Sequence, residues 1–314
     1  MKELLVNSLK SSFGLWINVL KMMIPISLGV KVLEEFGLIQ WVGALLEPIM
    51  VLVGLPGVMG LVWAITLFTN LWAGALLFVV LAGTVDMTSA QVTVLGIMML
   101  MAHGLPIELR MVQKCGVSVL FSLALRVFSA IILAGVFNHI FTYYGLLSEP
   151  AQILIGNVDN VDTSLTAWIY HQLESYVFVF IMLAFLVFLM DVLKKYGLIH
   201  KIGVLLSPYL SLMGVSKKCA PITFLGMTLG LVYGGALLLR ELEKNDMDED
   251  DVLISVTSMN LFHSLIEDSI IIFLMGGALF WIVVVRFIFT AIIMKLITTA
   301  IKINDAVLLK IIKA

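Results

Sequence analysis

The sequence predicts an all-α fold: a polytopic helical membrane protein made of two inverted repeats of about five membrane segments each. Three observations lead to this prediction: an apolar composition, long continuous apolar stretches and an internal duplication. Of the 314 residues, 61% are hydrophobic and only 13% are charged, whereas soluble domains carry about 25% charged residues. This composition excludes an ordinary soluble enzyme, a nucleic-acid binder and a disordered chain. We therefore expect the lipid bilayer as a partner and no nucleic acid.

Apolar stretches of membrane-spanning length recur along the chain. A helix needs about 20 mostly apolar residues to cross a bilayer, and several stretches meet this length while others are shorter or interrupted by Pro or a charge. In the order of the chain, the expected segments are 14–34, 38–54, 58–81, 90–106, 115–137, 173–194, 198–214, 219–240, 252–268 and 275–297.

The chain contains an internal duplication. Residues 36–48 align with residues 196–208 at an offset of 160, and both carry the pattern Gly-Leu-Ile-x-x-(Val/Ile)-Gly-x-Leu-Leu-x-Pro. A Gly-Ala-Leu-Leu block follows in both halves, and His103 pairs with His263 at the same offset. Apolar composition alone does not keep Gly, Pro and His in one register, so we infer a true repeat.

Charges near the segment ends predict the orientation. The expected organisation is a first repeat (1–140), an extracytoplasmic linker (141–168), a second repeat (169–300) and a cytoplasmic tail (301–314). The linker has no Lys or Arg, and positive residues in short loops favour the cytoplasm. Both termini are therefore expected in the cytoplasm of a plasma (inner) membrane protein, so each repeat crosses an odd number of times and the repeats are inverted.

The paired blocks resemble the nucleoside-recognition, or Gate, domain, present twice. This family includes the spore maturation A and B proteins, and related segments occur in the membrane part of ferrous-iron permeases and in concentrative nucleoside transporters. No GTPase domain precedes the membrane segments and the Gly-Cys-Asn-Val-Pro type of motif is missing, so the chain differs from a complete ferrous-iron permease. The resemblance implies a membrane protein that handles a small solute.

Ionisable and polar residues within apolar segments are the candidate site, because a charge at membrane depth costs about 2.5–3.5 kcal/mol or more unless it is paired or hydrated. A solvated loop is the alternative for the acids. Pro106 and the two histidines are expected to mark helix breaks that face each other near the middle of the bilayer, where the imidazoles can make transport pH-dependent. The candidate solute-binding residues are Asn70, His103, Glu108, Asn260, His263, Glu267 and Asp268.

Two arginines are expected to clamp the structure rather than bind solute. Arg126 and Arg286 lie inside the last helix of each repeat. A buried Arg pairs with an acid or extends to the headgroups. We expect Arg126 to pair with Glu108, and Arg286 to pair with Glu267 or Asp268.

The predicted function is a transporter or permease for a small polar solute, nucleoside-like or an ion, working by alternating access between the repeats. The alternative is a non-transporting membrane subunit of a complex like that of the spore maturation proteins. A membrane enzyme ranks last, because the sequence shows no set of nucleophile, base and orienting group. We expect no enzyme activity, no cofactor and no metal, and leave open a homo-oligomer or a second membrane subunit.

Overall fold

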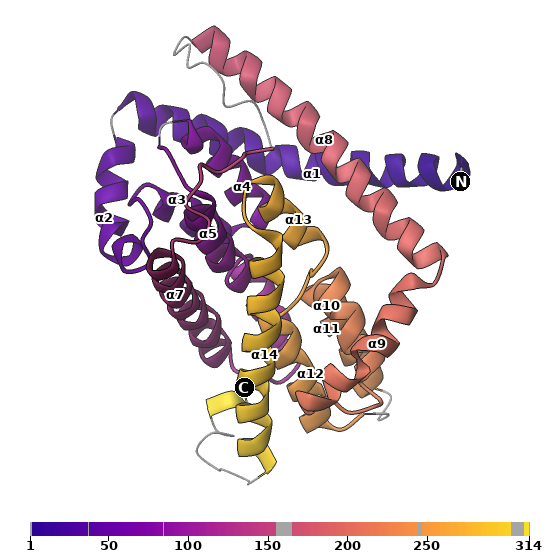
Figure 1. Ribbon diagram of the computed structural model, residues 1–314. Helices are drawn as coiled ribbons and strands as arrows, with labels where there is room; N and C mark the ends of the chain where they lie inside the picture. The colour runs from indigo at the N-terminus through magenta and orange to yellow at the C-terminus, as the bar shows by residue number, and fades with distance from the viewer. Residues whose placement is uncertain are drawn as a thin grey trace.

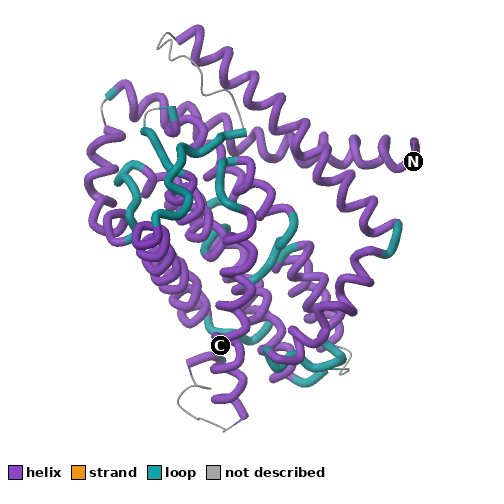
Figure 2. The backbone as a smooth tube through the Cα atoms, viewed as in Figure 1, coloured by secondary structure: helices purple, strands orange, loops and turns teal. Residues whose placement is uncertain are grey.

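The computed structural model describes residues 2–36, 38–83, 85–154, 165–243, 247–302 and 311–313. These residues form fourteen helices, joined by short loops (Figure 2). Part of the expected linker, 155–164, and part of the expected tail, 303–310, lie outside the described residues. Within what is described, the chain is an all-α helical membrane protein, as predicted.

The helices fall into two series of seven. The first series is α1 (Lys2–Glu35), α2 (Leu38–Leu52), α3 (Met59–Phe68), α4 (Leu71–Ala82), α5 (Ser89–Met101), α6 (Leu105–Lys114) and α7 (Val119–Tyr144). The second series is α8 (Leu165–Lys195), α9 (Leu198–Leu212), α10 (Ala220–Leu229), α11 (Leu231–Glu243), α12 (Glu249–Leu261), α13 (Glu267–Leu274) and α14 (Leu279–Lys302). Order and lengths correspond, and α2 and α5 begin 160 residues before α9 and α12.

The prediction of one continuous segment at 58–81, and of another at 219–240, is wrong. The first is divided into α3 and α4 at Thr69 and Asn70, and the second into α10 and α11 at Gly230. Asn70 has an extended backbone and caps α4, its Oδ1 accepting from the Ala73 N–H at 2.9 Å. Gly230 has φ +111° and ψ 151°. Residues other than glycine rarely adopt this conformation. Each pair of short helices forms a helical hairpin.

The hairpins are closely packed where their two helices cross. A Cβ added to Gly234 would lie 2.5 Å from the Gly226 backbone, and one added to Gly74 would lie 1.7 Å from Thr66 Oγ1. Small residues at such crossings let backbones approach closely, as they do in membrane helix pairs. Gly74 begins the Gly-Ala-Leu-Leu block of the first half, and Gly234 directly precedes the block of the second half, so the hairpin contacts lie at or next to these blocks.

Helices α7 and α14 run in opposite directions (Figure 1). The start of α14 lies beside α5, where the Ala278 N–H donates to Thr93 Oγ1 at 2.8 Å. The start of α7 lies at the other end of the molecule, close to the C-terminus, where the Ser118 N–H donates to the Ile312 carbonyl at 2.7 Å.

Helices α5 and α12 also run in opposite directions. The first residue of α5 donates its N–H to the carbonyl of Glu149, just past the end of α7, at 2.9 Å. The first turn of α12 lies at the C-terminal end of the molecule, where Asp250 forms an ion pair with Lys313 at 2.9 Å. The inner helices of the two series therefore enter the centre from opposite ends.

The long helices α1 and α8 pack against each other and cross beside the rest of the bundle (Figure 1). At the crossing, Trp16 Nε1 donates to the carbonyl of Tyr176 at 2.8 Å. These two residues are 160 positions apart, so they are equivalent members of the two series. This contact therefore joins corresponding positions of α1 and α8.

Three stretches within the described residues are long and apolar enough to cross a membrane: Ser89–Lys114, Val119–Tyr144 and Leu279–Ile301. The first, which contains α5 and α6, is mostly buried by the rest of the protein, whereas only about a third of each of the other two is buried. This difference in burial agrees with Figure 1, in which α7 and α14 cover the centre of the molecule. Helix α7 ends at Tyr144 and α8 begins at Leu165, so the helices extend into the expected 141–168 linker at both ends.

Candidate functional site

Both inner helices break at a histidine. Helix α5 ends at its cap residue Ala102 (φ −142°, ψ 96°), and α12 ends at Phe262 with nearly the same angles (φ −145°, ψ 93°). Two residues further on, Gly104 and Ser264 have left-handed backbones, with φ +56° and +48°. Glycine adopts this conformation freely, but for Ser264 it is uncommon and costs energy. The same break is therefore built twice, once without a glycine.

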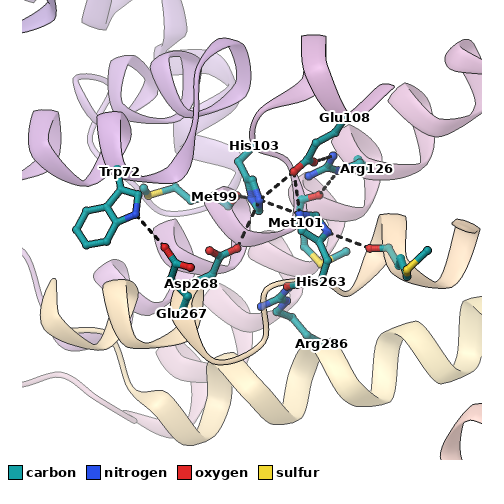
Figure 3. A network of polar contacts seen from close by, with 11 residues as sticks. Trp72, Met99, Met101, His103, Glu108, Arg126, His263, Glu267, Asp268 and Arg286 are labelled. Atoms are coloured by element: carbon teal, nitrogen blue, oxygen red, sulfur yellow. Dashed lines mark hydrogen bonds and ion pairs between the residues drawn. The ribbon is translucent and has the colours of Figure 1, made fainter. Parts of the chain in front are cut away.

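The breaks bring the two histidines into contact. His103 Nε2 and His263 Nε2 lie 2.9 Å apart, and both rings are buried (Figure 3). Each ring is held from behind by its own helix: Nδ1 of His103 lies 2.9 Å from the Met99 carbonyl and Nδ1 of His263 lies 2.9 Å from the Met259 carbonyl. The histidines are 160 residues apart, so they form a second contact between corresponding residues of the two series.

Two carboxylates border the histidines, one from each repeat. Glu108 lies in the first turn of α6 and Asp268 in the first turn of α13, where helix dipoles favour negative charge. Glu108 Oε1 is 3.1 Å from His263 Nε2 and 3.6 Å from His103 Nε2. Asp268 Oδ2 is 3.5 Å from His103 Nε2. The structure brings together four of the seven predicted binding residues, so these acids do not lie in solvated loops.

Arg126 has the partner expected for it. Its Nη1 forms an ion pair with Glu108 Oε2, and its Nε donates to the Met101 carbonyl, the last of α5, at 2.9 Å. The side chain is fully buried. Arg126 therefore links the outer helix α7 to both sides of the break.

Arg286 does not have the partner expected for it. Within the described residues it forms no ion pair with Glu267 or Asp268. Its Nη2 donates to the His263 carbonyl at 2.7 Å, and its guanidinium carbon lies 4.8 Å from the centre of the Phe262 ring. The physical reason is that the break exposes a carbonyl within reach and an aromatic face can stabilise a cation. Arg286 holds the backbone of the break instead of an acid.

Glu267 and Asn70 lie outside the contact between the histidines. Glu267 Oε1 accepts from Trp72 Nε1, on the hairpin of the other repeat, at 3.2 Å. His263 and Glu267 do not lie on one continuous helix, because α12 ends at Leu261 and α13 begins at Glu267. Asn70 lies at the tip of its hairpin, where its side chain caps α4. Glu267 therefore joins the two repeats, and Asn70 shapes the tip.

Asn260, the last of the predicted binding residues, is buried without a partner for its amide. Both Oδ1 and Nδ2 lack a hydrogen-bond partner among the described residues. The same is true of Asp268 Oδ2 and of Nε and Nη1 of Arg286. Unpaired buried polar atoms cost about 1–3 kcal/mol each. Nη2 of Arg126 in the first repeat also lacks a partner among the described residues, but most of these atoms belong to the second repeat.

The hairpin tips pack against the breaks. The Gly104 N–H donates to the Thr66 carbonyl of α3 at 3.0 Å, and the Leu265 N–H donates to the Met227 carbonyl of α10 at 2.9 Å. These bonds satisfy backbone groups that the breaks free at depth, as a membrane protein must. The centre is thus formed by two broken helices and covered by two hairpins.

The arrangement can hold a cation. His103, His263 and Asp268 each offer a ligand atom, and the three atoms lie within 4.8 Å of one another. The sequence pointed to no metal here, since the two histidines are 160 residues apart along the chain. It also missed Met99 and Met259, whose only signal is their position four residues before each histidine, the spacing that places a carbonyl and a side chain on one helix face.

Comparison with known proteins agrees with the family resemblance. Residues 16–113 match the family described as nucleoside recognition (Gate). The chain is also similar to the uncharacterized membrane protein YvoD of Bacillus subtilis (strain 168), with 24% identity over 294 residues that cover 91% of each chain. No solved structure matches. The Gate resemblance is therefore confirmed by the match over residues 16–113, and the membrane character by the relative.

Proposed function

We propose that the protein is a permease of the plasma membrane that carries a small polar solute past the two histidines. One observation carries the proposal: equivalent helix breaks from the two repeats meet in a buried, charged centre, with His103 and His263 in contact. Broken helices and ionisable groups are expensive within a membrane, and they are typical of solute pathways. Such a centre therefore favours a protein that transports a solute over one that does not.

The geometry supports alternating access between inverted repeats. The helix pairs α5/α12 and α7/α14 run in opposite directions, and equivalent residues meet at two points, Trp16/Tyr176 and His103/His263. An axis through these points, across the helices, is the arrangement in which each repeat can adopt the other's conformation around a fixed site. With both termini in the cytoplasm, a cysteine at Ser148→Cys should be labelled from outside the cell only.

Nucleosides are the first solutes to test, because the family matched by residues 16–113 is described as nucleoside recognition. The unpaired polar atoms of Asn260 and Arg286 can bond hydroxyl and base groups. Ions are the second class, since Arg126 pairs with Glu108, whereas Asp268 is buried and forms no ion pair with an arginine among the described residues.

Uptake by the purified full-length protein in liposomes tests the proposal. Labelled uridine and adenosine should accumulate faster than in empty liposomes, and the double change His103→Ala and His263→Ala should reduce uptake at least tenfold. The change His139→Ala is the control, because this exposed histidine stacks on Tyr143 of α7, away from the centre. It should leave uptake unchanged.

A lack of uptake across nucleosides, amino acids, organic anions and metal ions would contradict the proposal. Copurification of a second membrane protein in stoichiometric amount would then favour the alternative, a non-transporting subunit of a membrane complex. The proposal includes no enzymatic step, because the centre has no nucleophile next to a base.

A further inference from the structure

The contact between His103 and His263 places two lone pairs against each other. Each Nδ1 lies 2.9 Å from a backbone carbonyl oxygen, which can only accept a hydrogen bond. Each Nδ1 must therefore carry a proton, and in a neutral imidazole the other nitrogen then has a lone pair. The two Nε2 atoms are only 2.9 Å apart, which is unfavourable unless something positive lies between or beside them.

Two carboxylate oxygens point to the same place. Glu108 Oε1 lies 3.1 Å from His263 Nε2, and Asp268 Oδ2 lies 3.5 Å from His103 Nε2 (Figure 3). Asp268 Oδ2 is buried and has no hydrogen-bond partner among the described residues. His103, His263 and Asp268 each offer a donor atom within 4.8 Å of the others, and Glu108 Oε1 lies beside the two imidazoles. One bridging proton serves only two such donors, whereas one metal ion accepts electron pairs from several.

The surroundings match those of a metal centre. Histidine ligands normally donate their second ring N–H to a carbonyl or carboxylate, and ligating carboxylates are held by hydrogen bonds. Here the Met99 and Met259 carbonyls hold both rings, and Arg126 holds Glu108 through its other oxygen. These contacts fix the ligands before any ion arrives.

We infer that His103, His263 and Asp268, with Glu108, bind a divalent first-row transition-metal ion where the two repeats meet. Two imidazoles with carboxylates suit Zn²⁺, Fe²⁺ or Mn²⁺, whereas Mg²⁺ and Ca²⁺ prefer all-oxygen sites and Cu⁺ prefers sulfur. The inference rests on the proposed function in that both use the same buried centre. Metal binding does not require transport and can be measured without it.

Metal binding to the full-length protein in detergent tests the inference. After equilibration with Zn²⁺ and gel filtration, elemental analysis should find one Zn²⁺ per chain, and Mg²⁺ in large excess should not displace it. Co²⁺ should give visible absorption bands of a nitrogen- and oxygen-ligated ion. Asp268→Asn should weaken Zn²⁺ binding at least tenfold, and the double change His103→Ala and His263→Ala should abolish it.

Two changes elsewhere serve as matched controls: His139→Ala removes an exposed imidazole, and Glu149→Gln removes an exposed carboxylate. Both should keep the wild-type affinity. The inference is overturned if wild-type protein binds neither Zn²⁺ nor Co²⁺, a result that would leave a shared proton between the rings, or if the controls lose as much as Asp268→Asn. One Zn²⁺ per chain without nucleoside uptake would keep the inference and reject nucleoside transport.

Discussion

The two halves of the centre have the same backbone and different electrostatics. In the first, Arg126 pairs with Glu108 and also holds the end of α5. In the second, Arg286 and Asp268 occupy the equivalent positions but do not pair; the arginine bonds the His263 carbonyl, and Asp268 Oδ2 has no hydrogen-bond partner among the described residues. Nη2 of Arg126 also lacks a hydrogen-bond partner among the described residues, so the two halves differ in the arginine–acid pair, which forms only in the first.

This difference separates stability from binding. A buried ion pair that loses one member leaves an unpaired charge, so the first half should be sensitive to single changes. The unpaired atoms of the second half already carry a cost, which is acceptable where a ligand or water compensates it. We therefore expect loss of the arginine–acid pair in the first half to affect stability most, and changes at the unpaired atoms of the second half to affect binding more than stability.

The largest effect is expected for Arg126→Met. This change leaves Glu108 charged and buried, so the free energy of unfolding should fall by about 3–5 kcal/mol. Denaturant unfolding in detergent measures the loss, and adding Glu108→Gln should recover much of it. Additive effects of the two changes would show that the pair contributes no coupling.

A smaller effect is expected for Arg286→Met. The methionine can keep contact with the Phe262 ring, so the main loss is a hydrogen bond from a charged group, about 1.5–3 kcal/mol. The double-mutant cycle with Asp268→Asn, followed by the same unfolding measurement, should give a coupling below about 1 kcal/mol. A coupling as large as that of Arg126 and Glu108 would mean that the two halves are electrostatically alike.

The smallest effect on stability is expected for Asn260→Leu, which places in the second half the residue found at the equivalent position of the first, Leu100. Removing an unpaired buried amide should leave the free energy of unfolding unchanged or raise it by about 1 kcal/mol. Uptake of the transported solute should nevertheless fall. The reverse change, Leu100→Asn, is the control and should destabilise the protein. If uptake is unchanged in Asn260→Leu, Asn260 is not part of the binding site.

The fold class could be predicted because apolar runs and the 160-residue register are written directly in the chain. The helix breaks at His103 and His263 could also be predicted, the first because Gly104 and Pro106 interrupt a helix locally. The division of 58–81 could not be predicted from hydropathy, since apolar residues continue on both sides of Thr69 and Asn70. Asn before an apolar run is, however, an N-cap signal, and weighing it would have indicated the second helix.

The partner of a buried arginine could be predicted where one acid was available, and could not where several groups competed for the arginine. Glu108 is the acid nearest in sequence to Arg126, and the pair forms. Arg286 had two adjacent acids, but a broken helix also offers carbonyls and an aromatic face, and these depend on backbone angles that composition does not reveal. The position of Glu267 against Trp72 likewise depends on contact between repeats, which no local pattern encodes.

The contact between residues 160 positions apart has a consequence for how such a centre can arise. In a symmetric pair of identical single repeats, His103 and His263 would be one residue meeting its own copy, so one codon would supply both rings. Fusion of the two copies into one chain then frees each half to change alone. Ile107 stands at the position equivalent to Glu267, and Leu100 at the position equivalent to Asn260. A fused gene permits such differences between the two halves, whereas a pair of identical subunits does not.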